Sequence, residues 1–347
     1  MPARRDSSWD FRLARLVVVL GMALAVAMPG SVQAKGSGGD CKGRNLLSWL
    51  QSADPDAASR VQPTPSEARN DGAVLYEITK GDLPPSTLFG TVHLTDPRVT
   101  KLTPATKKAL KKSKILALEV AELSPKATSQ AVSNAMDLVL FDDGKTLDGL
   151  LSEDEFAIVA DRMEDSDTPQ HLARLFKPWV VSMIMSVSKC ERKKIAKGGL
   201  VLDMKLAETA RKASIPVVGL ETIKSQLEAA AQVPLEQQLE LLRASIVYAE
   251  RADDLMETVL QLYLNRQVSY AIPLQVVLAE KAGIDGTILR RFRRDLIERR
   301  NAIMAERAEK LLAEGGAFIA VGALHLPGRK GLVAKFKRLG YTVIPIE

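Results

Sequence analysis

The sequence has few histidines, cysteines and aromatic residues for its length. Among 347 residues there are three histidines and two cysteines, and aromatic residues make up 5%. The chain also lacks a Gly-x-Ser-x-Gly elbow, a His-Glu-x-x-His motif and a P-loop. These absences argue against serine hydrolases of the elbow type, zincins and P-loop nucleotide enzymes.

Aromatic-rich basic patches and long apolar runs are missing too. The formal net charge is +6, but no basic stretch is interleaved with aromatic residues, so nucleic-acid binding is not expected. The apolar run at residues 16–28 is shorter than the ~20 residues of a membrane-spanning helix. It follows four arginines and precedes the small-residue sequence Val32-Gln-Ala34, a pattern typical of a secretory signal peptide. We predict cleavage of residues 1–34, a periplasmic or secreted location and no stable membrane span afterwards; an uncleaved anchor is the alternative.

Both cysteines, Cys41 and Cys190, lie beyond the predicted cleavage site. An even pair in an exported chain predicts a disulfide, with two unpaired thiols as the alternative. Residues 35–70 are rich in small and polar residues apart from a short amphipathic stretch at 46–50, and they are expected to form a tail and linker. Residues 71–347 are expected to form one domain.

Short apolar runs alternate with helical patterns along this domain. Strands are expected at residues 73–79, 86–89, 115–120, 217–220, 318–322 and 341–345, and helices at 100–113, 201–212 and 330–339. The first two strands are predicted to form a hairpin. Longer helical segments at about 124–197 and 224–312 look like insertions over a cleft. This order predicts an α/β fold with a central mixed, partly parallel sheet, flanking helices and two helical insertions.

Two of the three histidines occur in the same local pattern. Gly90-x-x-His93 and Gly322-x-x-His325 each follow an expected buried strand. Glycine at a strand end allows a sharp turn or a close backbone approach, which would place the histidine over the sheet edge. The alternative is that both histidines are hydrogen-bonded residues at element ends. The third histidine, His171, is interpreted as a surface or packing residue.

Two glutamates follow strands in the same way. Glu119 and Glu221 end the expected strands at 115–120 and 217–220. Because ligands of open α/β sheets bind outside the carboxyl ends of the strands, both acids are expected near the histidines. The alternative for each is a solvated turn residue or a neighbour of a helix N-cap.

A helix expected at residues 287–312 offers two further polar groups. Phe292, Leu296, Arg300 and Met304 are spaced by four, so they are expected to share one face. An arginine on an apolar line either extends to the edge or reaches a buried acid. Asn301 is expected to supply an amide donor to the same site.

These residues fit metal-dependent hydrolysis. Two histidines and a carboxylate are a common ligand set for a divalent ion, so His93, His325 and either Glu119 or Glu221 are predicted to bind one. The other glutamate is expected to act as the base on a metal-bound water, and Arg300 or Asn301 to stabilise an oxyanion. Metal-free proton transfer between His and Glu is the alternative.

The ordered motifs resemble the TraB/GumN family, which is related to the Tiki proteins. The matching features are Gly90-x-x-His93, Leu118-Glu119, Leu220-Glu221-Thr222 with Gln226, Arg300-Asn301 with Met304, and Val321-Gly322-Ala-x-His325-Leu-Pro-Gly328, spanning about 74 to 345. The resemblance implies an α/β fold shared with erythromycin-esterase-like and haem-binding ChaN-like proteins. Tiki proteins are metal-dependent proteases, so it also implies that His93 and His325 bind a divalent metal (Mn, Co or Zn) and that Glu119 is the acidic ligand. Glu221 is then expected to act as the base or as a second ligand.

The leading hypothesis is therefore an exported metal-dependent hydrolase, peptidase-like, acting on a peptide or a small molecule. The alternatives are a non-catalytic haem- or peptide-binding envelope protein and a structural or regulatory envelope protein linked to polysaccharide export.

Overall fold

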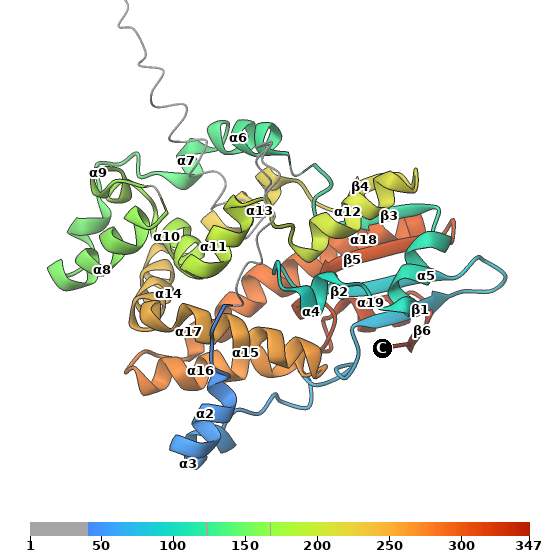
Figure 1. Cartoon of the computed structure of the whole chain (residues 1–347), viewed down its shortest axis with the longest axis horizontal. Coiled ribbons are helices and arrows are strands. Elements are labelled where there is room, and N and C mark those ends of the chain that lie inside the picture. Colours follow the sequence, from blue (N-terminus) through green and yellow to red (C-terminus); the bar gives the residue numbers. More distant parts are fainter. Residues whose placement is uncertain (1–40, 123, 167) are drawn as a thin grey trace, which may run out of the picture. The chain divides into compact units, whose positions relative to one another are not determined.

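The computed structural model describes residues 41–122, 124–166 and 168–347 (Figure 1). The predicted signal peptide, residues 1–34, lies outside the described residues. The described chain forms two compact units. The helical unit comprises Glu122–Gly198 and Ile223–Ala252, and the sheet unit comprises the described part of Ser37–Ala121 together with Gly199–Thr222 and Asp253–Glu347.

The sheet unit is built on a six-stranded mixed sheet with the order β4-β3-β5-β2-β1-β6. The strands are β1 (Leu75–Thr79), β2 (Ser86–Thr91), β3 (Ile115–Leu118), β4 (Val217–Gly219), β5 (Ala317–Gly322) and β6 (Thr342–Pro345). Strands β4, β3, β5 and β2 run parallel to one another, whereas β1 is antiparallel to both β2 and β6. The predicted mixed, partly parallel α/β sheet is confirmed, as is the hairpin of the first two strands.

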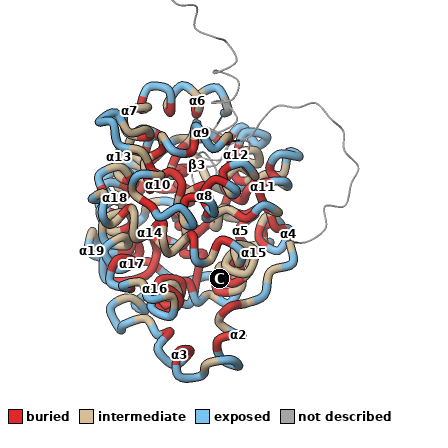
Figure 2. Tube along the Cα trace, turned by 90° about the vertical axis from the view of Figure 1, so that its left-hand side faces the viewer, coloured by how far each residue is buried: buried red, intermediate tan, exposed pale blue. Residues whose placement is uncertain are grey.

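Helices cover both faces of this sheet. One face packs against α5 (Pro104–Lys112), α12 (Leu202–Lys212) and α15 (Ala252–Leu264), through residues such as Leu110, Leu206 and Leu260. The other face packs against α18 (Arg299–Leu312) and α19 (Leu332–Arg338), through residues such as Met304 and Phe336. Figure 2 shows a mixture of exposed, intermediate and buried residues along α6 (Pro125–Ser133), whereas three of the four residues of β3 are buried. Because the parallel strands are covered on both faces, only their ends are open to polar chemistry.

The segment expected as a tail and linker is packed into the sheet unit. It contains α2 (Leu46–Ala53) and α3 (Pro55–Ser59), and Leu46 and Leu50 are fully buried. The backbone N–H of Leu46 donates to Thr258 Oγ1 of α15 over 2.7 Å. Apolar residues four apart give this short helix one buried face, which a free linker would not need.

The C-terminal helical region is not one continuous α-helix. The helix α17 (Thr287–Phe292) leads into a π-helical turn, Arg293–Glu298, before α18 begins. The wider turn shifts the helix face, so that Ile297 is buried and Leu296 is only half-buried. The predicted four-residue spacing through Leu296 is therefore wrong by one position. The remaining helices of this unit are α4 (Pro97–Thr100) and α16 (Ala271–Lys281).

The described residues of the helical unit contain α-helices, two short 3₁₀ turns at Leu147–Gly149 and Ala249–Arg251, and no extended sheet. Its helices are α6 (Pro125–Ser133), α7 (Met136–Val139), α8 (Glu153–Glu164), α9 (Gln170–Ala173), α10 (Pro178–Met185), α11 (Lys189–Ala196), α13 (Ile223–Ala231) and α14 (Leu235–Val247). Trp179 anchors it, since its indole N–H donates to Leu138 O and Gln238 accepts from its backbone N–H. Across the described parts of both units, no helix is long and apolar enough to cross a membrane.

Candidate functional site

The four strand-end residues lie at the carboxyl ends of the four parallel strands. His93 follows β2, Glu119 follows β3, Glu221 follows β4, and His325 lies in a 3₁₀ turn after β5. Because these strands are parallel neighbours, all four residues belong to one edge of the sheet. All four also belong to the sheet unit.

Three of these side chains approach the same point, the position that a Cβ of Gly322 would occupy. A Cβ built on Gly322 would lie 3.1 Å from Glu119 Oε1, 3.5 Å from His325 Cδ2 and 3.8 Å from His93 Nε2. The glycine thus leaves open a small space that two imidazoles and a carboxylate border. The backbone N–H of Gly322 donates to Glu119 Oε1 over 2.6 Å, which fixes that carboxylate toward the space.

Gly90, at the end of β2, allows the two histidine-bearing turns to pack together. A Cβ on Gly90 would lie 2.9 Å from Leu326 Cδ2 and 3.1 Å from the Cα of Ala323. The Tyr263 hydroxyl donates to Gly90 O over 2.7 Å and fixes the backbone there. Close approach, one of the two roles predicted for these glycines, is therefore what Gly90 provides.

His93 is oriented by a carboxylate. Its Nδ1 lies 2.7 Å from Asp203 Oδ2, and Thr91 Oγ1 donates to Asp203 Oδ1 over 2.7 Å. A carboxylate that faces Nδ1 makes that nitrogen the N–H donor, so Nε2 is left to face the space beside Gly322. The His93 side chain is 35% exposed, whereas that of Asp203 is 7% exposed.

His325 is oriented by an amide. Its Nδ1 lies 2.7 Å from Asn301 Oδ1, and Asn301 Nδ2 donates to Lys330 O over 3.1 Å. Because the amide nitrogen faces a carbonyl, the amide oxygen must face the imidazole, which makes Nδ1 of His325 the donor. The lone pair of Nε2 then faces Glu119 Oε1 at 3.7 Å. Two acceptors face each other here, which favours a cation between them.

Arg300 lies between the two glutamates. Its Nε lies 3.1 Å and 3.0 Å from the two carboxylate oxygens of Glu221, and its Nη2 bonds both Glu221 Oε2 and Glu119 Oε2. The side chains of Arg300, Glu119 and Glu221 are 17%, 12% and 2% exposed. Of the two alternatives for this arginine, the structure shows contact with buried acids.

This arrangement differs from three of the expected roles. Both oxygens of Glu221 accept hydrogen bonds from Arg300, so the structure shows Glu221 as an ion-pair partner instead of a free base. Arg300 engages two carboxylates rather than an oxyanion position. The amide of Asn301 donates to Lys330 O and accepts from His325, so it orients a histidine instead of contacting a substrate. Sequence patterns that identify strand ends and helix faces one at a time do not reveal which of these polar side chains pair with one another.

The surroundings change the proton affinities of the site in opposite directions. Burial lowers the pKa of His325 to about 4. Burial would also lower the pKa of His93, but the charge and hydrogen bond of Asp203 raise it to about 9. The pKa of Glu119 lies well below its usual range, because Arg300 and the two histidines outweigh the effect of burial. Of the two histidines, His93 is therefore expected to be protonated at neutral pH when no metal ion is bound, and His325 to be neutral.

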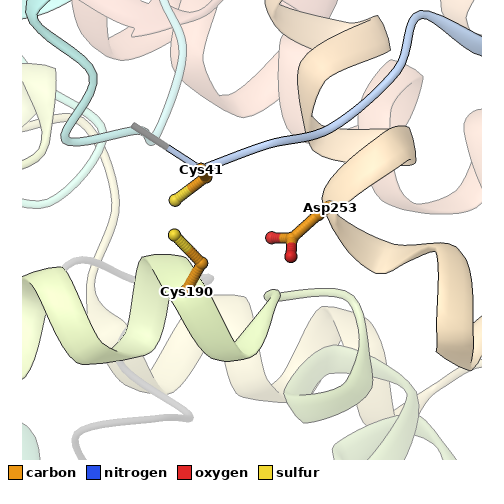
Figure 3. A group of neighbouring side chains, drawn as sticks. All are labelled: Cys41, Cys190 and Asp253. Carbon is orange, nitrogen blue, oxygen red and sulfur yellow. The ribbon is translucent and has the colours of Figure 1, made fainter. Parts of the chain in front are cut away.

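The donor set fits a divalent ion in kind, although the ligand atoms of His93, Glu119 and His325 do not all lie within 4.8 Å of one another. Metal–nitrogen bonds of about 2.0–2.1 Å require a closer set, so binding would draw the side chains inward. Among the described residues, Cys41, Cys190 and Asp253 do come that close (Figure 3). Both sulfurs belong to a disulfide, which confirms the predicted pair and leaves no thiolate to bind a metal.

Asp203 was not expected from sequence patterns. It lies in the first turn of α12 and is 5% exposed, although most acids are solvated. The available signal is its place beside Leu202 and Val201, two apolar residues that bury the start of the helix. That pattern suggests a buried acid but does not identify His93 as its partner.

The model of the TraB/PrgY/gumN family matches residues 74–345, which is most of the chain. No curated protein and no solved structure matches the sequence.

Proposed function

The chain belongs to the TraB/PrgY/gumN family, and from this premise we propose that it is a metal-dependent hydrolase whose ion is held by His93, Glu119 and His325. The observation that carries the proposal is the shared arrangement of the two histidines. Each has its Nδ1 held by an oxygen acceptor, and ring atoms of both lie beside Gly322 with Glu119 Oε1. Metal-binding histidines are almost always held in this way through their second nitrogen.

The charge of the site supports a divalent cation. Asp203, Glu119 and Glu221 contribute three largely buried carboxylates, whereas Arg300 contributes one guanidinium. Buried carboxylates are costly unless cations compensate them. With both histidines neutral, as metal ligation requires, two positive charges would balance the cluster.

The ion would act as a Lewis acid and lower the pKa of a bound water. The protein residues then have distinct tasks. Arg300 keeps Glu119 ionised and in place, and Glu221 holds Arg300 from the other side. Since the His93 side chain is 35% exposed and that of His325 only 6%, the substrate, a peptide or a small molecule, approaches from the side of His93.

An exported location is part of the proposal. A disulfide between Cys41 and Cys190 is stable in oxidising compartments and rare in the cytosol. This agrees with the secretory signal expected at residues 1–34, and both observations support a periplasmic or secreted location.

Metal analysis of the purified protein tests the proposal. His93→Ala and His325→Ala should each lose bound divalent metal and hydrolysis of a peptide library, whereas His171→Ala should retain both. His171 is the matched control because it is an exposed histidine on α9, in the helical unit. Chelation should abolish the activity of the wild type, and Mn²⁺, Co²⁺ or Zn²⁺ should restore it.

Equal metal content in all three variants would overturn the metal site. A Soret band in the wild-type protein, lost in His93→Ala or His325→Ala, would instead support the haem-binding alternative. Metal binding without hydrolysis of any peptide would reduce the proposal to a metal-binding protein.

A further inference from the structure

We propose that Asp203 is the positioning residue that sets the metal affinity of His93, and that Thr91 fixes Asp203 for this task. The inference rests on the proposed function, since it assumes that His93 binds an ion. It assigns a role to a buried acid that lies more than a hundred positions from the histidine in the sequence.

The position of Asp203 is rigidly defined. It lies in the first turn of α12, where a negative charge is favoured by the helix dipole. The flanking Leu202 is fully buried against the sheet, and its backbone N–H donates over 3.2 Å to Leu94 O, next to His93. The start of α12 is therefore joined directly to the turn that carries the histidine.

Both oxygens of Asp203 have defined partners. Oδ1 accepts from the Thr91 hydroxyl and Oδ2 faces His93 Nδ1, each over 2.7 Å. Thr91 is the last residue of β2 and is 2% exposed, so its hydroxyl cannot move far. The hydrogen bonds leave the carboxylate one orientation, which turns Nε2 of His93 toward Glu119 and Gly322.

The two histidines consequently differ in their support. His93 has an anionic acceptor in Asp203, whereas His325 has a neutral amide in Asn301. A carboxylate makes an imidazole a stronger electron donor than an amide does. Asp203 should therefore contribute to affinity through charge as well as through orientation.

Three substitutions separate these contributions. Asp203→Ala removes the charge and the oxygen acceptor that orients His93, whereas Asp203→Asn keeps an oxygen acceptor but removes the charge. Thr91→Val removes only the hydrogen bond from the Thr91 hydroxyl to Asp203 Oδ1. The matched control is Glu208→Gln, which removes a carboxylate from the same helix, where Glu208 forms its ion pairs with Lys205 and Lys212.

The assay is competition between the full-length, metal-stripped protein and a fluorescent chelator for Zn²⁺. Asp203→Ala should weaken Zn²⁺ binding about 10–100-fold, Asp203→Asn and Thr91→Val should weaken it less, and Glu208→Gln should bind as the wild type does. Because Asp203→Ala could fail to fold, circular dichroism checks each variant, and Asp203→Asn then carries the test. The proposal would be overturned if a folded Asp203→Ala, or Asp203→Asn when only that variant folds, bound Zn²⁺ with the affinity of the wild type. Loss of Zn²⁺ binding in His93→Ala would at the same time keep the proposed function intact.

A second readout does not depend on metal. In the metal-free protein, the proton on His93 Nδ1 should give a downfield NMR resonance in the wild type and in Asp203→Asn, and Asp203→Ala should lose it. If His93→Ala binds Zn²⁺ normally, the proposed function fails, and this resonance still decides whether Asp203 orients His93. Persistence of the resonance in Asp203→Ala would overturn the positioning role.

Discussion

Replacing Arg300 with methionine should strongly destabilise the sheet unit, because the two carboxylates it contacts would stay buried. Glu221 is 2% exposed and Glu119 12% exposed at their side chains. Removing one partner of a buried ion pair typically costs about 3–5 kcal/mol. We therefore expect the free energy of unfolding at neutral pH to fall by about 3–5 kcal/mol in Arg300→Met.

The destabilisation caused by Arg300→Met should be smaller at acidic pH. Burial would raise the pKa of Glu119, but Arg300 and the histidines hold it well below its usual range. A depressed carboxyl pKa contributes stability above the ordinary value of about 4.3, and this contribution disappears as pH falls through the folded value. Without Arg300 the pKa of Glu119 should rise, so the variant binds a proton at higher pH. The difference in the free energy of unfolding between the wild type and Arg300→Met should therefore become smaller as pH falls from neutral to about 4.

Urea unfolding followed by circular dichroism measures both effects. The matched control is Arg299→Met, since the neighbouring arginine is 67% exposed and pairs with Asp295 at the surface over 3.1 Å. Loss of such a surface pair should cost less than about 1 kcal/mol. Adding Glu221→Gln to Arg300→Met should recover part of the stability. If Arg300→Met matches Arg299→Met, or if its deficit is the same at acidic pH, the argument from buried charge is wrong.

Four further outcomes are expected from the site and the sequence. In the metal-free protein, NMR titration should show the pKa of His93 raised to about 9 and the pKa of His325 lowered to about 4. The stability that His93 contributes should therefore be lost as pH rises through 9, and the stability that His325 contributes should be lost as pH falls through 4. One common pKa for both histidines would contradict this prediction. Gly322→Ala should reduce metal content, because the added Cβ would lie 3.1 Å from Glu119 Oε1. It should cost little thermal stability, because the backbone φ of −50° suits alanine. Unchanged metal content would count against the space beside Gly322 as the metal site. N-terminal sequencing of the exported protein should begin at Lys35, and a chain starting at Met1 in the membrane fraction would show an anchor instead. Thiol counting on the denatured, unreduced protein should find none, and reduction should lower stability by up to about 4–5 kcal/mol, since the disulfide closes a loop of about 150 residues.

The strand ends are predictable from the sequence because their signals are local. Gly90-x-x-His93 and Gly322-x-x-His325 each mark, within a few residues, the end of a strand and the histidine beyond it. The parallel order then brings both to one edge of the sheet without further information. Glu119 and Glu221 are predictable for the same reason, although their partner is not.

The roles of the polar groups depend on contacts that a single sequence does not encode locally. Arg300 contacts acids 181 and 79 positions away, and Asp203 orients a histidine 110 positions away. The π-helical turn before Arg300 also breaks the spacing on which the helix face was predicted. Whether an acid acts as a base or as an ion-pair partner is decided by such contacts, and they require the fold.

The order of the strands in the sheet has a consequence for biosynthesis. β5 is the last parallel strand to be made, yet it lies between β3 and β2 and is hydrogen-bonded to both. A nascent chain that stops short of residue 317 lacks the strand that joins the two halves of the sheet, the Gly322 N–H that holds Glu119, and His325 itself. A nascent chain that has not yet released residues 317–325 therefore cannot assemble the site, and the proposed hydrolysis begins only once the C-terminal segment has been made and has folded.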